Sequence, residues 1–205
     1  MRELDGMAEW TAASALHLAV FGYAGREYGI SPRLLAALRE NSGSVIGALD
    51  PDGALVGFCY GFTGVGDGEL YHYSQAAVVA SRAQGLGVGR RLKRAQAEVA
   101  RSTGARTMRW TFDPYALRNA HFNLDVLGAT GVRFLPDYYG EATDRILVSW
   151  DLWGSRRPGV PLPPVEASDR AVLRQALRDR FDTGARLTGV THSPGRVAYL
   201  FEGDA

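Results

Sequence analysis

A strand-like run, a glycine-rich connection and an amphipathic helix follow one another between residues 69 and 103, and this order constrains the fold more than any other feature of the chain. Residues 69–79 end in an apolar run typical of a buried strand. Residues 87–103 predict a helix ended by Gly104, because apolar side chains recur there at helical spacing. These side chains are Val88, Leu92, Ala95 and Val99. A helix that returns to the sheet through a tight loop indicates an α/β fold.

The remaining patterns complete a mixed central sheet flanked by helices. Two helices precede an antiparallel pair of strands, whose turn is Pro51-Asp52-Gly53. Two further strands follow a short helix that Gly128 ends. The predicted helices are 7–21, 31–40 and 117–127, and the predicted strands are 44–50, 54–62, 107–112, 132–139 and 145–152. We therefore expect one α/β domain over residues 1–152.

The C-terminal quarter of the chain predicts a small extension of a different kind. Residues 153–165 hold four of the nine prolines and indicate a linker or extended strap. Within 166–205 we expect a helix that Ser168 caps and that runs to about Phe181, and a β-hairpin around residues 193–195. This piece is too short for a core of its own, so it needs the main domain or a partner chain to cover. A homodimer is one way to supply that surface.

Composition excludes several classes of protein. The 205 residues include 23 basic and 22 acidic side chains, a net charge of +1. The chain therefore lacks the overall excess of positive charge that is typical of nucleic-acid-binding proteins. The apolar stretch 12–21 follows three acidic residues, which argues against a signal peptide, and no apolar run reaches the roughly 20 residues that span a bilayer. The single cysteine, Cys59, has no disulfide partner or metal-ligand motif. We expect a cytoplasmic protein without a bound metal.

The connection between strand and helix carries the chemistry. Residues 82–89 read Arg-Ala-Gln-Gly-Leu-Gly-Val-Gly, so that backbone N–H groups can converge on an anion at a helix N-terminus. A dinucleotide-binding loop would need glycine at Arg90, and a P-loop would need Gly-Lys-Ser/Thr, so both are excluded. Five cations and no acid lie between 82 and 94, namely Arg82, Arg90, Arg91, Lys93 and Arg94. The segment predicts a polyanion site; the alternative is a tight turn beside a solvated helix face.

This loop and the order of elements resemble the Gcn5-related N-acyltransferases (GNAT), whose R/Q-x-x-G-x-G/A loop follows the fourth strand and binds the pyrophosphate of acetyl-CoA. The resemblance covers about residues 3–152 and implies a first strand reduced to a few residues near 2–4. It implies pantetheine contacts from the backbone of Gln75, Ala76 and Ala77, which would also assist the oxyanion. It implies pyrophosphate contacts from the amides of Ala83, Gln84, Gly85, Leu86, Gly87 and Val88, flanked by Arg82, Gly89 and Arg90.

Three further segments look like one branch of that family. They are Trp110–Pro114, Arg118–Asn123 and Asp137–Gly140. Some relatives in that branch are associated with N-acylation of amino acids, including succinylation. The resemblance therefore implies a small amine of amino-acid type as the acceptor.

An amine that attacks a thioester directly needs a proton acceptor and a donor for the departing thiolate, and no enzyme nucleophile. The family often uses a tyrosine as that donor, and its position here holds Leu124. Tyr139, Tyr138, His121 or water would have to replace it. His121 and Asp125 lie four residues apart on a predicted helix, so the carboxylate can orient the imidazole; the alternative is a structural helix pair.

Three other polar residues are candidates. His72 lies on the fourth strand, where bases of the family often sit, and its alternative is a satisfied strand histidine. Asn119 and Asn123 are also four residues apart and can bond pantetheine amides or the substrate, or else cap the helix.

Together these features predict an N-acyltransferase that transfers an acetyl or related group, such as succinyl, from CoA to a small amine in a ternary complex. Two alternatives stay open. One is an acyl-CoA-binding sensor or interaction protein without turnover, which Leu124 motivates. The other is an acyltransferase that acts on a protein N-terminus or lysine.

Overall fold

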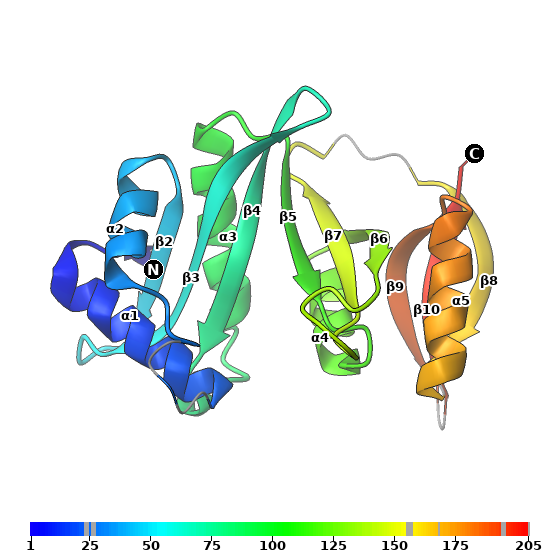
Figure 1. Cartoon of the computed structure of the whole chain (residues 1–205), viewed down its shortest axis with the longest axis horizontal. Helices are drawn as coiled ribbons and strands as arrows, with labels where there is room; N and C mark the ends of the chain where they lie inside the picture. Colours follow the sequence, from blue (N-terminus) through cyan, green and yellow to red (C-terminus); the bar gives the residue numbers. More distant parts are fainter. Residues whose placement is uncertain (23–24, 26–27, 155–157, 168, 194–195, 205) are drawn as a thin grey trace. The chain divides into compact units, whose positions relative to one another are not determined.

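The computed structural model describes residues 1–22, 25, 28–154, 158–167, 169–193 and 196–204. The chain divides into two compact units, residues 1–108 and 109–205, and each is described by itself. The first unit begins with a short strand and two helices, as the sequence predicts (Figure 1). Its elements are β1 (Arg2–Glu3), α1 (Gly6–Phe21), α2 (Pro32–Glu40), β2 (Ser44–Leu49), β3 (Leu55–Gly66), β4 (Glu69–Val79) and α3 (Val88–Ser102).

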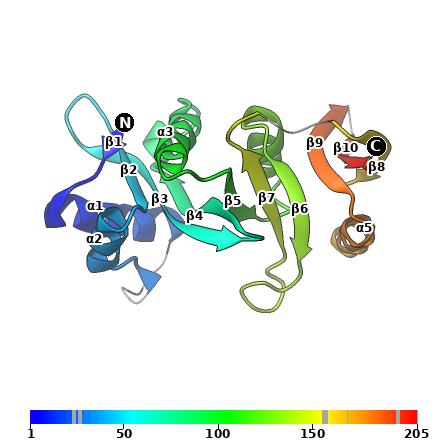
Figure 2. The same ribbon diagram turned by 90° about the horizontal axis from the view of Figure 1, so that it is seen from above.

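The strands of the first unit follow the order β1-β2-β3-β4 and pair antiparallel. Helices α1 and α2 cover one face of this sheet, and α3 covers the other (Figure 2). Successive residues supply the two cores, because side chains alternate between the faces of a strand. Val45 and Phe58 face α1 and α2, whereas Ile46 and Cys59 face α3. Strands β2 and β3 are therefore held from both sides.

Strand β3 is longer than the predicted strand 54–62. Gly64 and Gly66 indicate a loop in the sequence, yet they pair with Tyr71 and Glu69 of β4. A Cβ atom built on Gly64 would lie 2.8 Å from the Tyr71 ring, so glycine is needed there for close approach of the ring. The hairpin turn is consequently shorter than predicted.

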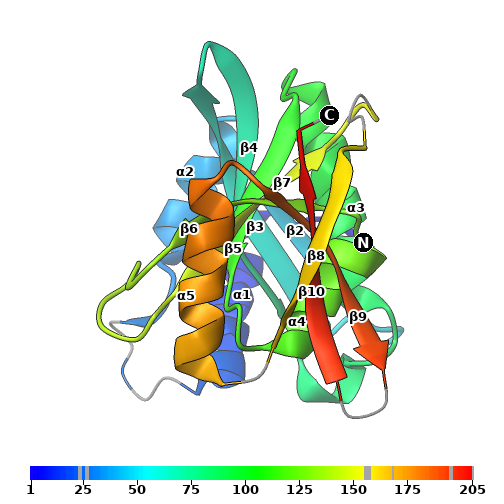
Figure 3. The ribbon, with the colours of Figure 1, turned by 90° about the vertical axis from the view of Figure 1, so that its right-hand side faces the viewer.

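The second unit carries the rest of the sheet and the C-terminal extension. Its elements are β5 (Thr107–Phe112, beginning just before the boundary), α4 (Leu117–His121), a π-helical turn (Phe122–Val126), β6 (Thr130–Leu135), β7 (Arg145–Asp151), β8 (Val160–Glu166), α5 (Arg170–Asp182), β9 (Arg186–Ser193) and β10 (Arg196–Gly203). The strand order is β5-β7-β6-β9-β10-β8. Figure 3 shows α5 running beside the strands of the extension.

Part of the predicted linker is a strand. Residues 160–166 form β8, which pairs antiparallel with β10. Of the two alternatives predicted for 153–165, the second half therefore agrees with an extended strap and not with a linker; residues 155–157 lie outside the described part. The three prolines of β8 are tolerated because β8 is an edge strand. In the described part of the chain it has a neighbouring strand on one side only, so the missing N–H groups can face the side without a partner strand.

The extension packs within its own chain. Strand β9 pairs with β6 at Leu187 and Gly131, so the sheet continues into the extension. Leu177, Leu187 and Phe201 are buried, and the Tyr199 hydroxyl donates to the carbonyl of Pro114. This chain thus supplies the surface that the extension needs. The homodimer was predicted because the extension lacked such a surface, so that reason no longer applies.

The N-cap of helix α5 lies one residue later than predicted. It is Asp169, whose side chain accepts from the amides of Ala171 and Val172. The predicted cap, Ser168, and the predicted turn residues Pro194 and Gly195 lie outside the described residues. The prediction of a mixed α/β sheet flanked by helices is confirmed. Among the described residues, no helix is long and apolar enough to cross a membrane.

Candidate functional site

The loop between β4 and α3 has the backbone of an anion cradle. Gly85 and Gly87 have φ angles of 78° and 72°, a left-handed conformation that favours glycine. Gly87 is the N-cap of α3, and the Arg91 amide donates to its carbonyl at 3.1 Å. The amides of Val88 and Gly89 precede that first helical bond and have no acceptor within the helix. They are available to an anion at the positive end of the helix dipole.

The loop is anchored at both ends and open between them. Ala83 and Val88 are buried in the core beneath α3, whereas the intervening residues 84–87 are exposed. Cβ atoms built on Gly85 or Gly87 would meet no atom within 4 Å. An anionic group can therefore approach this backbone without displacing protein atoms.

The cation at the start of the loop has a structural partner. The Arg82 guanidinium lies 2.8 Å from a carboxylate oxygen of Asp50, whose other oxygen accepts from the amide of Ala54. The Gln84 side chain donates to the carbonyl of Val79 at 3.2 Å. Both contacts tie the loop to its own unit, while Arg90 stays exposed beside the helix start.

Strand β4 contains an irregularity just before the loop. Ala76 pairs with Tyr60, but Ser74 pairs with Gly61, so Gln75 is an extra residue without a partner on β3. Such a bulge releases backbone groups from the ladder and bends the strand. Gln75 and Ala77 are exposed, and Ala76 packs against the core on the α1 side. The backbone segment that the resemblance assigns to pantetheine is thus a bulged one.

A buried chain of polar side chains joins α3 to the sheet. The Lys93 ammonium donates to the Ser74 hydroxyl at 2.7 Å, and this hydroxyl donates to Gln96 Oε1 at 2.7 Å. Gln96 Nε2 donates to the Ser44 hydroxyl at 2.9 Å, which lies 2.8 Å from His72 Nε2. The five side chains come from β2, β4 and α3, and each is at most 4% exposed.

This burial changes the titration of two of these groups. Loss of solvation lowers the pKa of Lys93 to about 7. Burial, with a smaller contribution from the charge of Lys93, lowers the pKa of His72 to about 4. His72 is therefore neutral and enclosed at neutral pH. This favours the alternative interpretation, in which His72 is a structural residue of the strand whose hydrogen bonds are made within the protein.

The burial of Lys93 differs from what its sequence context predicts. Its charge suggests a solvated cation among the arginines of α3, yet the structure buries it. The available signal was its spacing, because Lys93, Gln96, Ala97 and Ala100 share one helical stripe and are all buried. Four exposed cations of the predicted set remain, namely Arg82, Arg90, Arg91 and Arg94.

In the second unit, His121 and Asp125 form the expected pair. His121 Nδ1 lies 2.7 Å from Asp125 Oδ2, and the imidazole side chain is 51% exposed. A carboxylate only accepts hydrogen bonds, so the proton of a neutral His121 ring sits on Nδ1 and the lone pair on Nε2. In that tautomer Nε2 is the ring nitrogen that can accept a proton.

The two asparagines do not share a surface. Asn119 is exposed on α4, whereas Asn123 is buried in the π-helical turn and accepts from the Trp110 indole N–H at 2.9 Å. Leu124 is also buried. The helix changes from α to π after His121, and this rotates the side chains of the later residues to other directions. The predicted continuous helix 117–127 does not include this rotation.

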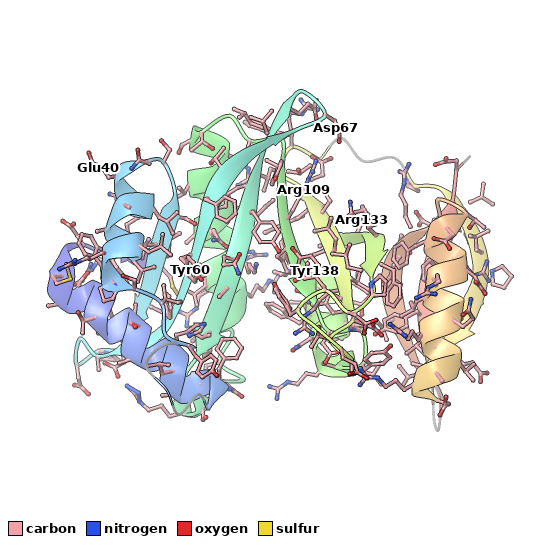
Figure 4. The ribbon with its side chains drawn as sticks, in the orientation of Figure 1. Glu40, Tyr60, Asp67, Arg109, Arg133 and Tyr138 are labelled. Atoms are coloured by element: carbon pink, nitrogen blue, oxygen red, sulfur yellow. The ribbon has the colours of Figure 1, made fainter. Side chains whose placement is uncertain are left out.

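Tyr138 and Tyr139 lie in the connection between β6 and β7, where Figure 4 labels Tyr138. Their rings meet edge to face, with centroids 4.6 Å apart, and both side chains are exposed. The Arg145 guanidinium lies 5.4 Å from the centre of the Tyr139 ring. Among the described residues, no group of three or more His, Cys, Asp or Glu side chains is placed to hold a metal ion.

A strand, a glycine loop and a helix N-terminus in this order are typical of α/β proteins that bind a phosphate-bearing ligand. The profile of the acetyltransferase (GNAT) family matches residues 10–124, which is more than half of the chain. The protein belongs to this family. No curated protein sequence matches this chain significantly.

Solved structures show the same fold. A GNAT-family acetyltransferase from Desulfovibrio desulfuricans has a TM-score of 0.61 at 16% identity, over 74% of this chain and 97% of its own. YncA of Salmonella typhimurium, solved with acetyl-CoA, gives 0.60 at 19% identity, over 77% and 95%. An aminoglycoside 6'-N-acetyltransferase complexed with coenzyme A gives 0.58 at 19% identity, over 76% and 98%. About a quarter of this chain has no counterpart in each.

Replacing Lys93 tests the buried network. Between pH 7 and 10.5 the unfolded chain keeps the Lys93 proton that the folded protein has lost, so the free energy of unfolding rises with pH there. We expect Lys93→Met to be more stable than the wild type at pH 7, by about 1–3 kcal/mol, and to lose this advantage towards pH 10. Urea unfolding at a series of pH values measures both effects. The control is Arg94→Met at the exposed neighbouring position, and parallel curves for Lys93→Met and wild type would contradict the prediction.

Proposed function

We propose that this protein is an acyl-CoA-dependent N-acyltransferase that transfers an acetyl or related group, such as succinyl, to the amine of a small molecule such as an amino acid. The observation that carries the proposal is the open, left-handed glycine loop at the start of α3, in a chain of the GNAT family. Its free Cys59 is buried and fits a reducing, cytoplasmic setting.

The cofactor roles follow from the local backbone. The amides from Gly85 to Gly89 would hold the pyrophosphate, because they lie in the open part of the loop and at the positive end of the helix dipole. The amides of Ala83 and Gln84, which the resemblance also assigns to the pyrophosphate, instead donate to the carbonyls of Ala80 and Ser81. Arg90 would add a charge-assisted contact. The bulge at Gln75, with Ala76 and Ala77, would bond pantetheine. Arg82 would act by bracing the loop through Asp50.

The reaction is a direct substitution. The amine nitrogen bonds to the thioester carbonyl carbon, the C–S bond breaks, and the products are an amide and free CoA. His121 is our candidate for the acceptor of the amine proton, because Asp125 orients its ring. Tyr139 is our candidate for the proton donor to the thiolate, since Leu124 at the usual position is buried and apolar. Asn119, which is exposed, is the better placed asparagine for a ligand.

The acceptor follows from the resemblance to amino-acid acylating relatives. Three structures with this fold are described as aminoglycoside 6'-acetyltransferases, which supports a small-molecule acceptor by analogy. The NatC complex bound to a Gag peptide has the same fold and supports the protein acceptor as the alternative. We expect no nucleic acid or membrane partner. The acyl-CoA sensor remains the second candidate, and buried Leu124 is the observation that favours it.

Release of free thiol measures turnover directly. We expect wild-type protein to release CoA from acetyl-CoA or succinyl-CoA when an amino acid or small amine is added, and not without one. A peptide panel with free N-termini and lysines tests the protein-acceptor alternative. Binding of CoA by calorimetry without thiol release from any acceptor would support the sensor and overturn the enzyme.

Substitution of one glycine tests the cradle. We expect Gly85→Ala to weaken binding of acetyl-CoA at least about tenfold, because the new Cβ occupies the space of the anion. Gly68→Ala is the matched control: it has a φ of 78° and open space around it, but lies in the β3–β4 turn. Calorimetry gives both affinities, and equal affinities would refute the cradle.

Loss of the imidazole tests the proton acceptor. We expect His121→Gln to lower kcat about a hundredfold while leaving the affinity for acetyl-CoA unchanged, since general-base catalysis contributes on this scale. Steady-state kinetics and calorimetry separate the two quantities. A variant with the kcat of the wild type would remove His121 from the mechanism.

A further inference from the structure

One carboxylate links the C-terminal extension to His121. Asp125 Oδ2 holds His121 Nδ1, and Asp125 Oδ1 accepts from the backbone amide of Val190 at 3.3 Å. Val190 belongs to β9, which lies beside the π-helical turn. Because a carboxylate held at both oxygens has little freedom to rotate, β9 fixes the direction from which Asp125 orients the imidazole.

The residue before Val190 leaves room for this arrangement. A Cβ atom built on Gly189 would lie 3.0 Å from Asp125 Oδ1, which is tighter than ordinary contact. Any other residue at 189 would therefore push the carboxylate by a few tenths of an ångström. Glycine here serves the approach of a side chain, and no left-handed backbone is involved.

Helix α5 of the extension bonds to the connection that carries Tyr139, the second candidate for proton transfer. Arg174 of α5 donates from Nε to Asp144 at 2.9 Å and from Nη2 to Asp137 at 2.6 Å. Asp144 is almost fully buried and also accepts from the Tyr115 hydroxyl and the Asp137 amide. Burial opposes ionisation of Asp144, but the bonds from these donors outweigh it and hold its pKa below the usual value.

These bonds enclose the connection that carries Tyr139. Asp137 accepts from the amide of Ala142, and the Tyr139 amide donates to the Thr143 hydroxyl at 2.8 Å. Arg170 of α5 donates to the carbonyl of Ala142 at 2.7 Å. Both ends of the connection 136–144 are thus bonded to α5 or to the carboxylate that α5 neutralises.

We propose that the C-terminal extension is a positioning element of the enzyme, in which β9 sets His121 through Asp125 and α5 sets the Tyr139 connection through Arg174. The proposal rests on the proposed function, because it assigns a purpose to the residues that hold its two proton-transfer candidates. Gly189, Asp125 and Arg174 are positioning residues, and each acts through another group.

The β9 contact is tested by displacing the carboxylate slightly. We expect Gly189→Ala to lower kcat about fivefold, with the KM for acetyl-CoA unchanged, because small misplacements of catalytic groups slow the reaction strongly. Gly203→Ala in β10 is the matched control, since its Cβ would lie 3.6 Å from Leu162, an ordinary contact. Asp125→Asn keeps the Val190 bond through Oδ1 but loses the acceptor for His121, and we expect a similar fall in kcat.

The α5 contact is tested by removing the guanidinium. We expect Arg174→Gln to lower kcat about tenfold without changing the affinity for acetyl-CoA. We also expect amide hydrogen exchange in residues 137–143 to accelerate, because the connection loses its bonds to α5. Arg178→Gln, one turn further along α5 and exposed, is the control. Exchange gives a readout that needs no turnover.

The outcomes separate the two proposals. An active wild type whose Gly189→Ala, Asp125→Asn and Arg174→Gln variants have the kcat of the controls overturns the positioning role and leaves the acyltransferase standing. Unchanged exchange in 137–143 of Arg174→Gln overturns the α5 part by itself. A wild type that transfers no acyl group to any acceptor overturns the proposed function, and the positioning role falls with it.

Discussion

The buried amine of Lys93 constrains how α3 packs against the sheet in the first unit. An ammonium group without solvent must find acceptors, and it finds the hydroxyl of Ser74 on β4. Through Gln96 and Ser44 the same chain of bonds reaches β2, so that α3 has one register against the sheet. The N-terminus of α3, and with it the glycine cradle, is placed by this register. The Ser74 contact also lies next to the bulge at Gln75.

Carboxylates have the corresponding role in the second unit. Asp125 joins the π-helical turn to β9, and Asp144 joins the β6–β7 connection to α5. Each accepts bonds from residues far apart in the sequence, and for the buried Asp144 these bonds hold the pKa below its usual value. The extension is therefore packed and hydrogen-bonded as part of this unit. A loosely tethered appendage would not be bonded to these two carboxylates.

The elements near the cradle could be predicted because their signals are local. Turn glycines, helical periodicity and the run of 69–79 each depend on neighbouring residues, and the predicted strand and helix agree closely with β4 and α3. Signals that depend on distant partners were misleading. The prolines of 160–165 indicated a linker, because the sequence does not show that β10 lies beside them. Lys93 was placed in solvent for the same reason.

The sequence by itself determined the class of fold, through the order of its elements. It also determined the place of the glycine loop and the pairing of His121 with Asp125, since both follow from spacing within one segment. Only the tertiary structure decided which polar residues are enclosed, as with His72 and Asn123, and which are braced by the extension. The physical reason is that desolvation and hydrogen bonding depend on what packs against a side chain, and these neighbours are brought together by folding.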